Sequence, residues 1–146
     1  MNDNLKAAIA AGTAIVRHVR VDRNLAPMGG DKSYGRKNFL NEEVVASMPQ
    51  YAEDEVDVYF IPIKGTLPVK DVAAFLAQYG LLSSPHAQAA VNEQDPTFAD
   101  EHPNFSQWGD NCYLVFNRWL GVRYVGCDRD DDDWDDCWFV SGVLAL

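Results

Sequence analysis

The last third of the chain alternates between three segments typical of β-strands and one dense run of acids. Residues 111–117, 122–127 and 137–146 are rich in β-branched and aromatic side chains. The first two are predicted to form an antiparallel hairpin that turns at residues 118–121. The third segment is apolar on both faces, which is typical of a central strand or a strand covered by a helix. The C-terminal part is therefore predicted to form a sheet.

The remaining segments complete an α+β fold. The strongest predicted helix is 68–79, because Pro68 stands at its start and Gly80 follows its end. Shorter helices are predicted at 5–11, 41–48 and 84–92, and a long loop at 22–39. We predict a mostly antiparallel sheet of about five strands with helix 68–79 on one face, the strands being 13–21, 56–63, 111–117, 122–127 and 137–146.

Length and composition predict a single globular domain over residues 1–146. The chain is 47% hydrophobic, which is enough apolar material for one core. It contains no apolar run that would cross a bilayer and no convincing secretory signal, so we expect no membrane association and a cytoplasmic location. The odd number of cysteines agrees with a reducing compartment.

The charge is strongly negative and unevenly distributed. The whole chain carries a net charge of −10, with +4 in residues 1–40 and −14 in residues 41–146. An acidic surface of this size argues against direct binding of nucleic acid. It favours a protein partner, and the opposite charges of the two segments also allow association between copies of the chain.

The acid run places seven carboxylates within nine residues, 128–136. Carboxylates this close repel one another, so they must be solvated, neutralised by a cation or held against a basic partner. Trp134 lies inside the run, where an indole could fix the loop against the sheet. The predicted binding residues of this run are Asp128, Asp130, Asp131, Asp132, Asp133, Trp134, Asp135 and Asp136.

The run resembles a calcium loop only in part. An EF-hand loop needs alternating acids, glycine at its sixth position and glutamate at its twelfth. Asp128, Asp130 and Asp132 satisfy the first requirement, but Asp133 and Phe139 occupy the sixth and twelfth positions. The EF-hand motif therefore fails, and a looser Ca²⁺ or Mg²⁺ site on the three alternating acids remains as an alternative.

Two residues outside the run are added to the predicted binding set. Trp119 falls in a predicted turn, and exposed tryptophan beside carboxylates is typical of an interface anchor or of a pocket for a cationic ligand. His102 follows Asp100 and Glu101, a pairing that a general base requires but that also occurs by chance. No nucleophile motif is visible, so no catalytic residue is assigned.

One family resemblance concerns the C-terminal pattern. Trp134, Trp138 and the surrounding acids, together with residues 89–96 and 98–104, resemble the ends of uncharacterised bacterial and prophage-type proteins. The similarity covers roughly the last sixty residues. It implies a small accessory protein and carries no activity with it.

The sequence thus predicts an acidic interaction protein that binds a basic partner through its acidic, tryptophan-bearing loop. A nucleic-acid mimic is a narrower version, which the clustering of the acids makes less favoured. The alternative is a divalent-metal-dependent enzyme or metal-binding protein that uses the run 128–136. An enzyme is the less favoured of the two readings.

Overall fold

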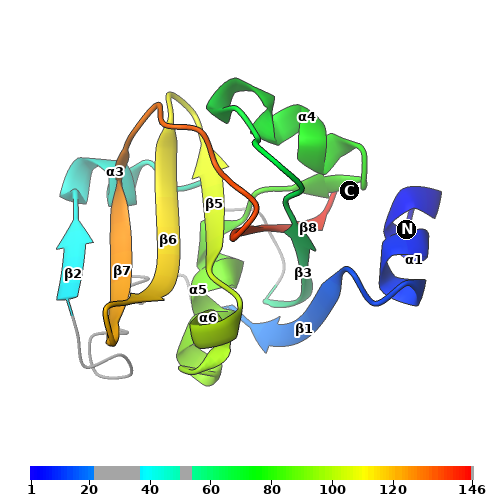
Figure 1. Ribbon diagram of the computed structural model, residues 1–146, viewed down its shortest axis with the longest axis horizontal. Helices are drawn as coiled ribbons and strands as arrows, with labels where there is room; N and C mark the ends of the chain where they lie inside the picture. The colour runs from blue at the N-terminus through cyan, green and yellow to red at the C-terminus, as the bar shows by residue number, and fades with distance from the viewer. Residues whose placement is uncertain (22–36, 50–53, 146) are drawn as a thin grey trace.

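One mixed sheet organises the computed structural model, which describes residues 1–21, 37–49 and 54–145. Its strands are β1 (Ile15–Arg20), β2 (Lys37–Leu40), β3 (Glu55–Pro62), β4 (Leu81–Leu82), β5 (Asn104–Trp108), β6 (Cys112–Trp119), β7 (Val122–Arg129) and β8 (Phe139–Leu144). They follow one another in the order β1-β3-β8-β5-β6-β7-β2, and β4 pairs with β8 (Figure 1). The C-terminal strand is therefore central, as its apolar sequence predicts.

The prediction of a mostly antiparallel sheet of about five strands is wrong. Among the described residues, eight strands form the sheet, and two of the pairings, β2 with β7 and β5 with β8, are parallel. The missed strands lack an apolar signal: β5 reads Asn-Phe-Ser-Gln-Trp, β4 has only two residues, and β2 falls at the end of the predicted loop. The rest of that loop, residues 22–36, lies outside the described residues.

The helices are short and mostly begin where the sequence indicates. They are α1 (Asp3–Ala10), α3 (Glu42–Ala46), α4 (Val72–Ala77), α5 (Pro85–Gln94) and α6 (Phe98–Glu101), and one 3₁₀ turn, η1 (Val69–Asp71), precedes α4. The Asn41 side chain accepts hydrogen bonds from the backbone N–H groups of Glu43 and Val44, as an N-cap does. The segment predicted as one helix, 68–79, forms instead the 3₁₀ turn η1 followed by the short helix α4.

Alternation along the strands separates two packed faces. On β6, the side chains of Leu114 and Phe116 pack with α3 and with Ala89 of α5. Val115 points to the other face, where Phe105 and Val140 pack with residues of α1 and α4. Figure 1 shows α5 and α6 on one side of the sheet. The second face is covered by α1, α4 and the segment between β7 and β8.

The connection from β7 to β8 crosses the sheet. Because β5 and β6 lie between β8 and β7 in the strand order, the chain cannot make this connection as a hairpin. Figure 1 shows the segment leaving the end of β7 and passing over β6 and β5 before it enters β8. This crossing makes β8 parallel to β5. It also carries the acid run over the second face of the sheet.

Helix α6 is tied to the β6–β7 hairpin by a charged cluster. Asp100 accepts two hydrogen bonds from the Arg123 guanidinium, at 3.0 and 2.9 Å, and lies 3.3 Å from Arg118. The hydrogen bond from Arg123 is the main reason why the pKa of Asp100 is lowered. A bidentate pair of this kind orients both partners as well as stabilising them.

We expect Asp100→Asn to lower the free energy of unfolding at pH 7 by about 1 kcal/mol. A carboxylate with a lowered folded-state pKa stabilises the fold above its unfolded-state pKa, and this contribution is lost as the pH falls through the folded-state pKa. The difference between variant and wild type should therefore be constant near neutrality and shrink below about pH 4. Urea denaturation at several pH values measures it, and a difference that grows under acid would contradict the assignment.

Candidate binding site on the acidic loop

The acidic loop, residues 128–136, is held to the sheet at its centre by backbone pairing. Trp134 and Leu67 form an isolated antiparallel bridge, with N–H to O distances of 2.9 and 2.7 Å. At the start of the loop, the Asp130 N–H donates to the Asn111 carbonyl oxygen at 3.0 Å. The loop is therefore fixed at two points on segments that are distant in sequence.

Trp134 anchors the loop through its side chain as well. Its ring stacks on Phe105 of β5 with 3.7 Å between centroids and 7° between planes. Its Nε1–H donates to the Gln107 side-chain oxygen at 2.8 Å. The rings of Trp134 and Trp138 pack nearly perpendicular to each other, with 5.2 Å between centroids and 79° between planes. Trp134 is therefore partly buried against the sheet and fixes the centre of the loop there.

The aspartates on both sides of Trp134 point outward. Asp130, Asp131, Asp132, Asp133, Asp135 and Asp136 are exposed, and Asp128 is partly buried. The described residues contain no group of three His, Cys, Asp or Glu side chains that could hold a metal ion. Asp128 accepts instead from the Asn41 side chain at 2.9 Å, and Asp130 accepts the Asp132 N–H at 3.0 Å. The three alternating acids thus do not converge as a Ca²⁺ or Mg²⁺ site requires.

The end of the loop contains a thiol–carboxylate pair. Asp135 accepts hydrogen bonds from the Cys137 N–H at 3.1 Å and from its Sγ at 2.8 Å. The thiol hydrogen bond is the largest reason why the pKa of Asp135 is lowered. Partial burial, followed by the hydrogen bond to Asp135, raises the pKa of Cys137 to about 11. This exposed cysteine is therefore a poor nucleophile near neutrality, because only the thiolate reacts.

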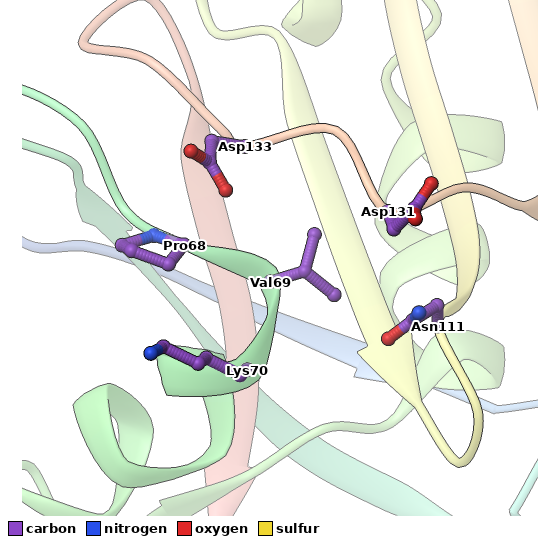
Figure 2. A pocket seen from close by; sticks show the side chains of 6 residues that line it. All are labelled: Pro68, Val69, Lys70, Asn111, Asp131 and Asp133. Atoms are coloured by element: carbon purple, nitrogen blue, oxygen red, sulfur yellow. The ribbon is translucent and has the colours of Figure 1, made fainter.

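Two open hollows border the loop. The first has a volume of about 420 Å³ and lies between the loop, η1 and the β5–β6 turn. Its lining includes the positive charge of Lys70 as well as negative aspartates. Figure 2 shows Asp131 and Asp133 on the loop side of this hollow, with Val69 projecting from η1 toward the loop. Its lining residues are Pro68, Val69, Lys70, Asn111, Asp131 and Asp133.

The second hollow, about 250 Å³, is aromatic at its base and acidic at its rim. Tyr113 and Tyr124 come from neighbouring strands, and burial is the main cause that raises the pKa of both phenols, that of Tyr113 to about 12. Both phenols are thus neutral near pH 7, and aspartates provide the negative charge. The lining residues are Tyr113, Val115, Asn117, Tyr124, Asp130, Asp132, Asp133, Trp134 and Trp138.

Neither Trp119 nor His102 is among the residues that line the two hollows beside the acidic loop. Trp119 pairs with Val122 at the hairpin tip, whereas Cys112 and Arg129 form the opposite end of the same ladder. Trp119 lies two residues beyond Asn117 on the same face of β6, roughly 7 Å further along the strand toward the hairpin tip. His102 follows α6, and its ring packs against Phe98 and Phe139 with 5.0 and 5.1 Å between ring centroids. Both were predicted as members of one binding set with the acids, and that membership stays a prediction.

Sequence reasoning missed the tyrosines and Asn117. The signal was present, since strand alternation places Tyr113, Val115 and Asn117 on one face of β6. Tyr124 joins them because it is the direct partner of Asn117 in the ladder. What the sequence lacked was the path of the acidic loop, which carries the carboxylates over this face.

Comparison with known proteins identifies no relative of this chain. No family model, no curated protein and no solved structure matches it. None of the helices in the described ranges is both long and apolar enough to span a membrane.

Proposed function

We propose that this protein is a small acidic binding protein whose loop 128–136 docks a basic protein partner. The observation that carries the proposal is that one residue anchors the loop to the sheet while the acids of the same loop face solvent. Trp134 is packed on Phe105, while six aspartates around it are exposed. A carboxylate cluster presented on an anchored backbone keeps its charges in place for a partner, so less conformational entropy is lost when the partner binds.

Charge supports the same proposal. Only Asp128 and Asp135 of the loop accept hydrogen bonds from side chains among the described residues, through Asn41 and Cys137. The remaining carboxylates lie close to one another, with Lys70 lining the first hollow beside Asp131 and Asp133. A basic partner would relieve the repulsion among them. Such a surface accelerates association with a basic protein, and the effect decreases as salt is added. Double-stranded nucleic acid carries the same sign of charge and would be repelled.

The test measures binding of a fluorescently labelled deca-lysine peptide by anisotropy at several salt concentrations. Asn at positions 130–133 retains the size and the carbonyl oxygen of each side chain, including the acceptor for the Asp132 N–H. We expect the fourfold variant Asp130→Asn, Asp131→Asn, Asp132→Asn, Asp133→Asn to bind about tenfold more weakly at low salt, since each rim charge contributes up to about 1 kcal/mol. The salt dependence of binding should also decrease.

A matched variant controls for net charge. It removes four exposed acids elsewhere on the chain, through Asp3→Asn, Glu55→Gln, Asp57→Asn and Glu101→Gln. This control should bind deca-lysine almost as well as wild type, because salt screens charges that lie outside the surface in contact with the peptide. Equal loss of affinity in both variants would show that only net charge matters and would overturn the assignment of the loop. Sedimentation of the free protein shows whether a second copy is the partner, and dimerisation lost in the loop variant would identify the chain itself.

A further inference from the structure

The geometry points to an arginine side chain as the ligand of the second hollow, an inference that rests on the proposed binding of a basic partner and names the group recognised. We propose that a partner's guanidinium enters between the tyrosines of β6 and β7 and the carboxylates of the acidic loop. The chemistry of the walls, the shape of the base and one unpaired acceptor carry this inference.

The described walls of the hollow offer acceptors and contain no lysine or arginine. Asp130, Asp132 and Asp133 supply carboxylates at the rim, all exposed. The indole Nε1–H of Trp134 already donates to Gln107. The phenols, the Asn117 amide and the Trp138 indole are neutral, so the three carboxylates give the hollow a net negative charge that favours a cationic ligand. A guanidinium brings five N–H groups and no acceptor.

Asn117 supplies a second, independent sign of a missing donor. Its side-chain carbonyl oxygen is buried and accepts no hydrogen bond from any described residue. A buried acceptor without a partner costs free energy, and in native proteins an ordered water, an ion or a bound group commonly satisfies it. Asn117 is one of the lining residues of the hollow, so a rotation of its amide would bring this oxygen within reach of a ligand held by the carboxylates.

The aromatic base favours a planar cation. The Tyr124 side chain folds back over Gly126, where an added Cβ would come within 2.7 Å of its ring. This glycine therefore allows the Tyr124 ring to lie along the strand toward Val115, the ladder partner of Gly126. Tyr113 and Trp138 line the same space. Guanidinium stacks on aromatic faces while its edge donates to carboxylates, whereas an ammonium keeps a compact hydration shell.

The experiment compares labelled deca-arginine and deca-lysine peptides on the same protein. We expect deca-arginine to bind about three- to tenfold more tightly than deca-lysine, and Tyr124→Leu to remove the preference while deca-lysine binding is unchanged. Trp119→Leu, which removes an aromatic side chain that is 71% exposed on the same hairpin, should keep the preference. A thermal melt of each variant confirms that it is folded.

A direct measurement on the wild-type protein makes the test independent of any variant. In a ¹H–¹⁵N spectrum, adding Ac-Gly-Arg-Gly-NH₂ should shift the indole N–H signals of Trp134 and Trp138 more than that of Trp119. The peptide with neutral citrulline in place of arginine should leave all three unchanged. Equal affinity for the two decapeptides, with no selective shift, would overturn the arginine site and leave the proposed acidic docking surface intact. No binding of either decapeptide at low salt would overturn both.

Discussion

Replacement of Trp134 by alanine is expected to lower the free energy of unfolding by about 3–4 kcal/mol. The indole is stacked on Phe105 and packed against Trp138, so its removal opens a cavity in the second face of the sheet. The hydrogen bond to Gln107 is lost as well. Because a domain of this size is stable by only about 5–15 kcal/mol, this change removes a large part of its stability.

Urea denaturation followed by far-UV circular dichroism measures the effect. Trp119→Ala is the matched control, because this tryptophan is 71% exposed and its removal should change stability by less than about 0.5 kcal/mol. Trp134→Phe keeps an aromatic ring on Phe105 and loses the hydrogen bond, so it should cost about 1–2 kcal/mol. If the two alanine variants were equally stable, Trp134 would not be the anchor of the loop.

Trp134→Ala also distinguishes the role of the indole in binding from its role in stability. Below its unfolding transition, the Trp134→Ala protein retains all seven aspartates of the loop but loses the side chain that fixes them over the sheet. We therefore expect its affinity for deca-arginine to fall more than its affinity for deca-lysine. The acids alone attract any polycation, whereas the aromatic base of the hollow requires the loop in place.

Elements with a strong local pattern could be predicted from the sequence. Strands β3, β6, β7 and β8 were found because β-branched and aromatic residues dominate them. Helix α5 was found because Pro85 begins it. In these segments local preference and tertiary environment agree, and the pattern alone is sufficient to identify them.

The strand order and the complete site could not be predicted in the same way. One buried face of β5 carries Asn104 and Ser106, two polar residues that hydrogen-bond to Asn92 and Ser141 on other elements. When β5 is not recognised, the sequence predicts that β7 and β8 are adjacent and joined as a hairpin. The acid run would then be the hairpin turn and would point away from the sheet. The hollow exists only because β5 and β6 separate β7 from β8 and the loop must cross them.

Asn104→Ala is expected to cost roughly 3–4 kcal/mol, because the amide side chain of Asn104 is the centre of a buried polar network. Asn104 accepts from Gln88 Nε2 at 2.9 Å and from Asn92 Nδ2 at 2.8 Å. It donates to the Asn92 side-chain oxygen at 3.0 Å and to the His102 carbonyl at 2.9 Å. Gln88, Asn92 and Asn104 are all fully buried. No water replaces these four hydrogen bonds unless the site opens.

A double-mutant cycle with Gln88 tests whether the network acts as a unit. Gln88→Leu and Asn104→Leu together should cost less than the sum of the two single changes, by about 1 kcal/mol or more. Each single change leaves buried polar groups of the other partner with fewer hydrogen bonds, whereas the double change removes both partners. Additive costs would mean that α5 and β5 are joined by packing alone.

Asn104→Asp supplies a further test with a predicted pH dependence. The introduced carboxyl is nearly isosteric but would carry a charge at a fully buried position, so burial raises its folded-state pKa above the unfolded value. A group with a raised folded-state pKa costs least when it is protonated. The variant should therefore be strongly destabilised at pH 7 and approach wild type as the pH falls toward 4, whereas Asn104→Ala keeps a constant deficit. A carboxylate tolerated equally at both pH values would show that solvent reaches this site and that the network is not part of the core.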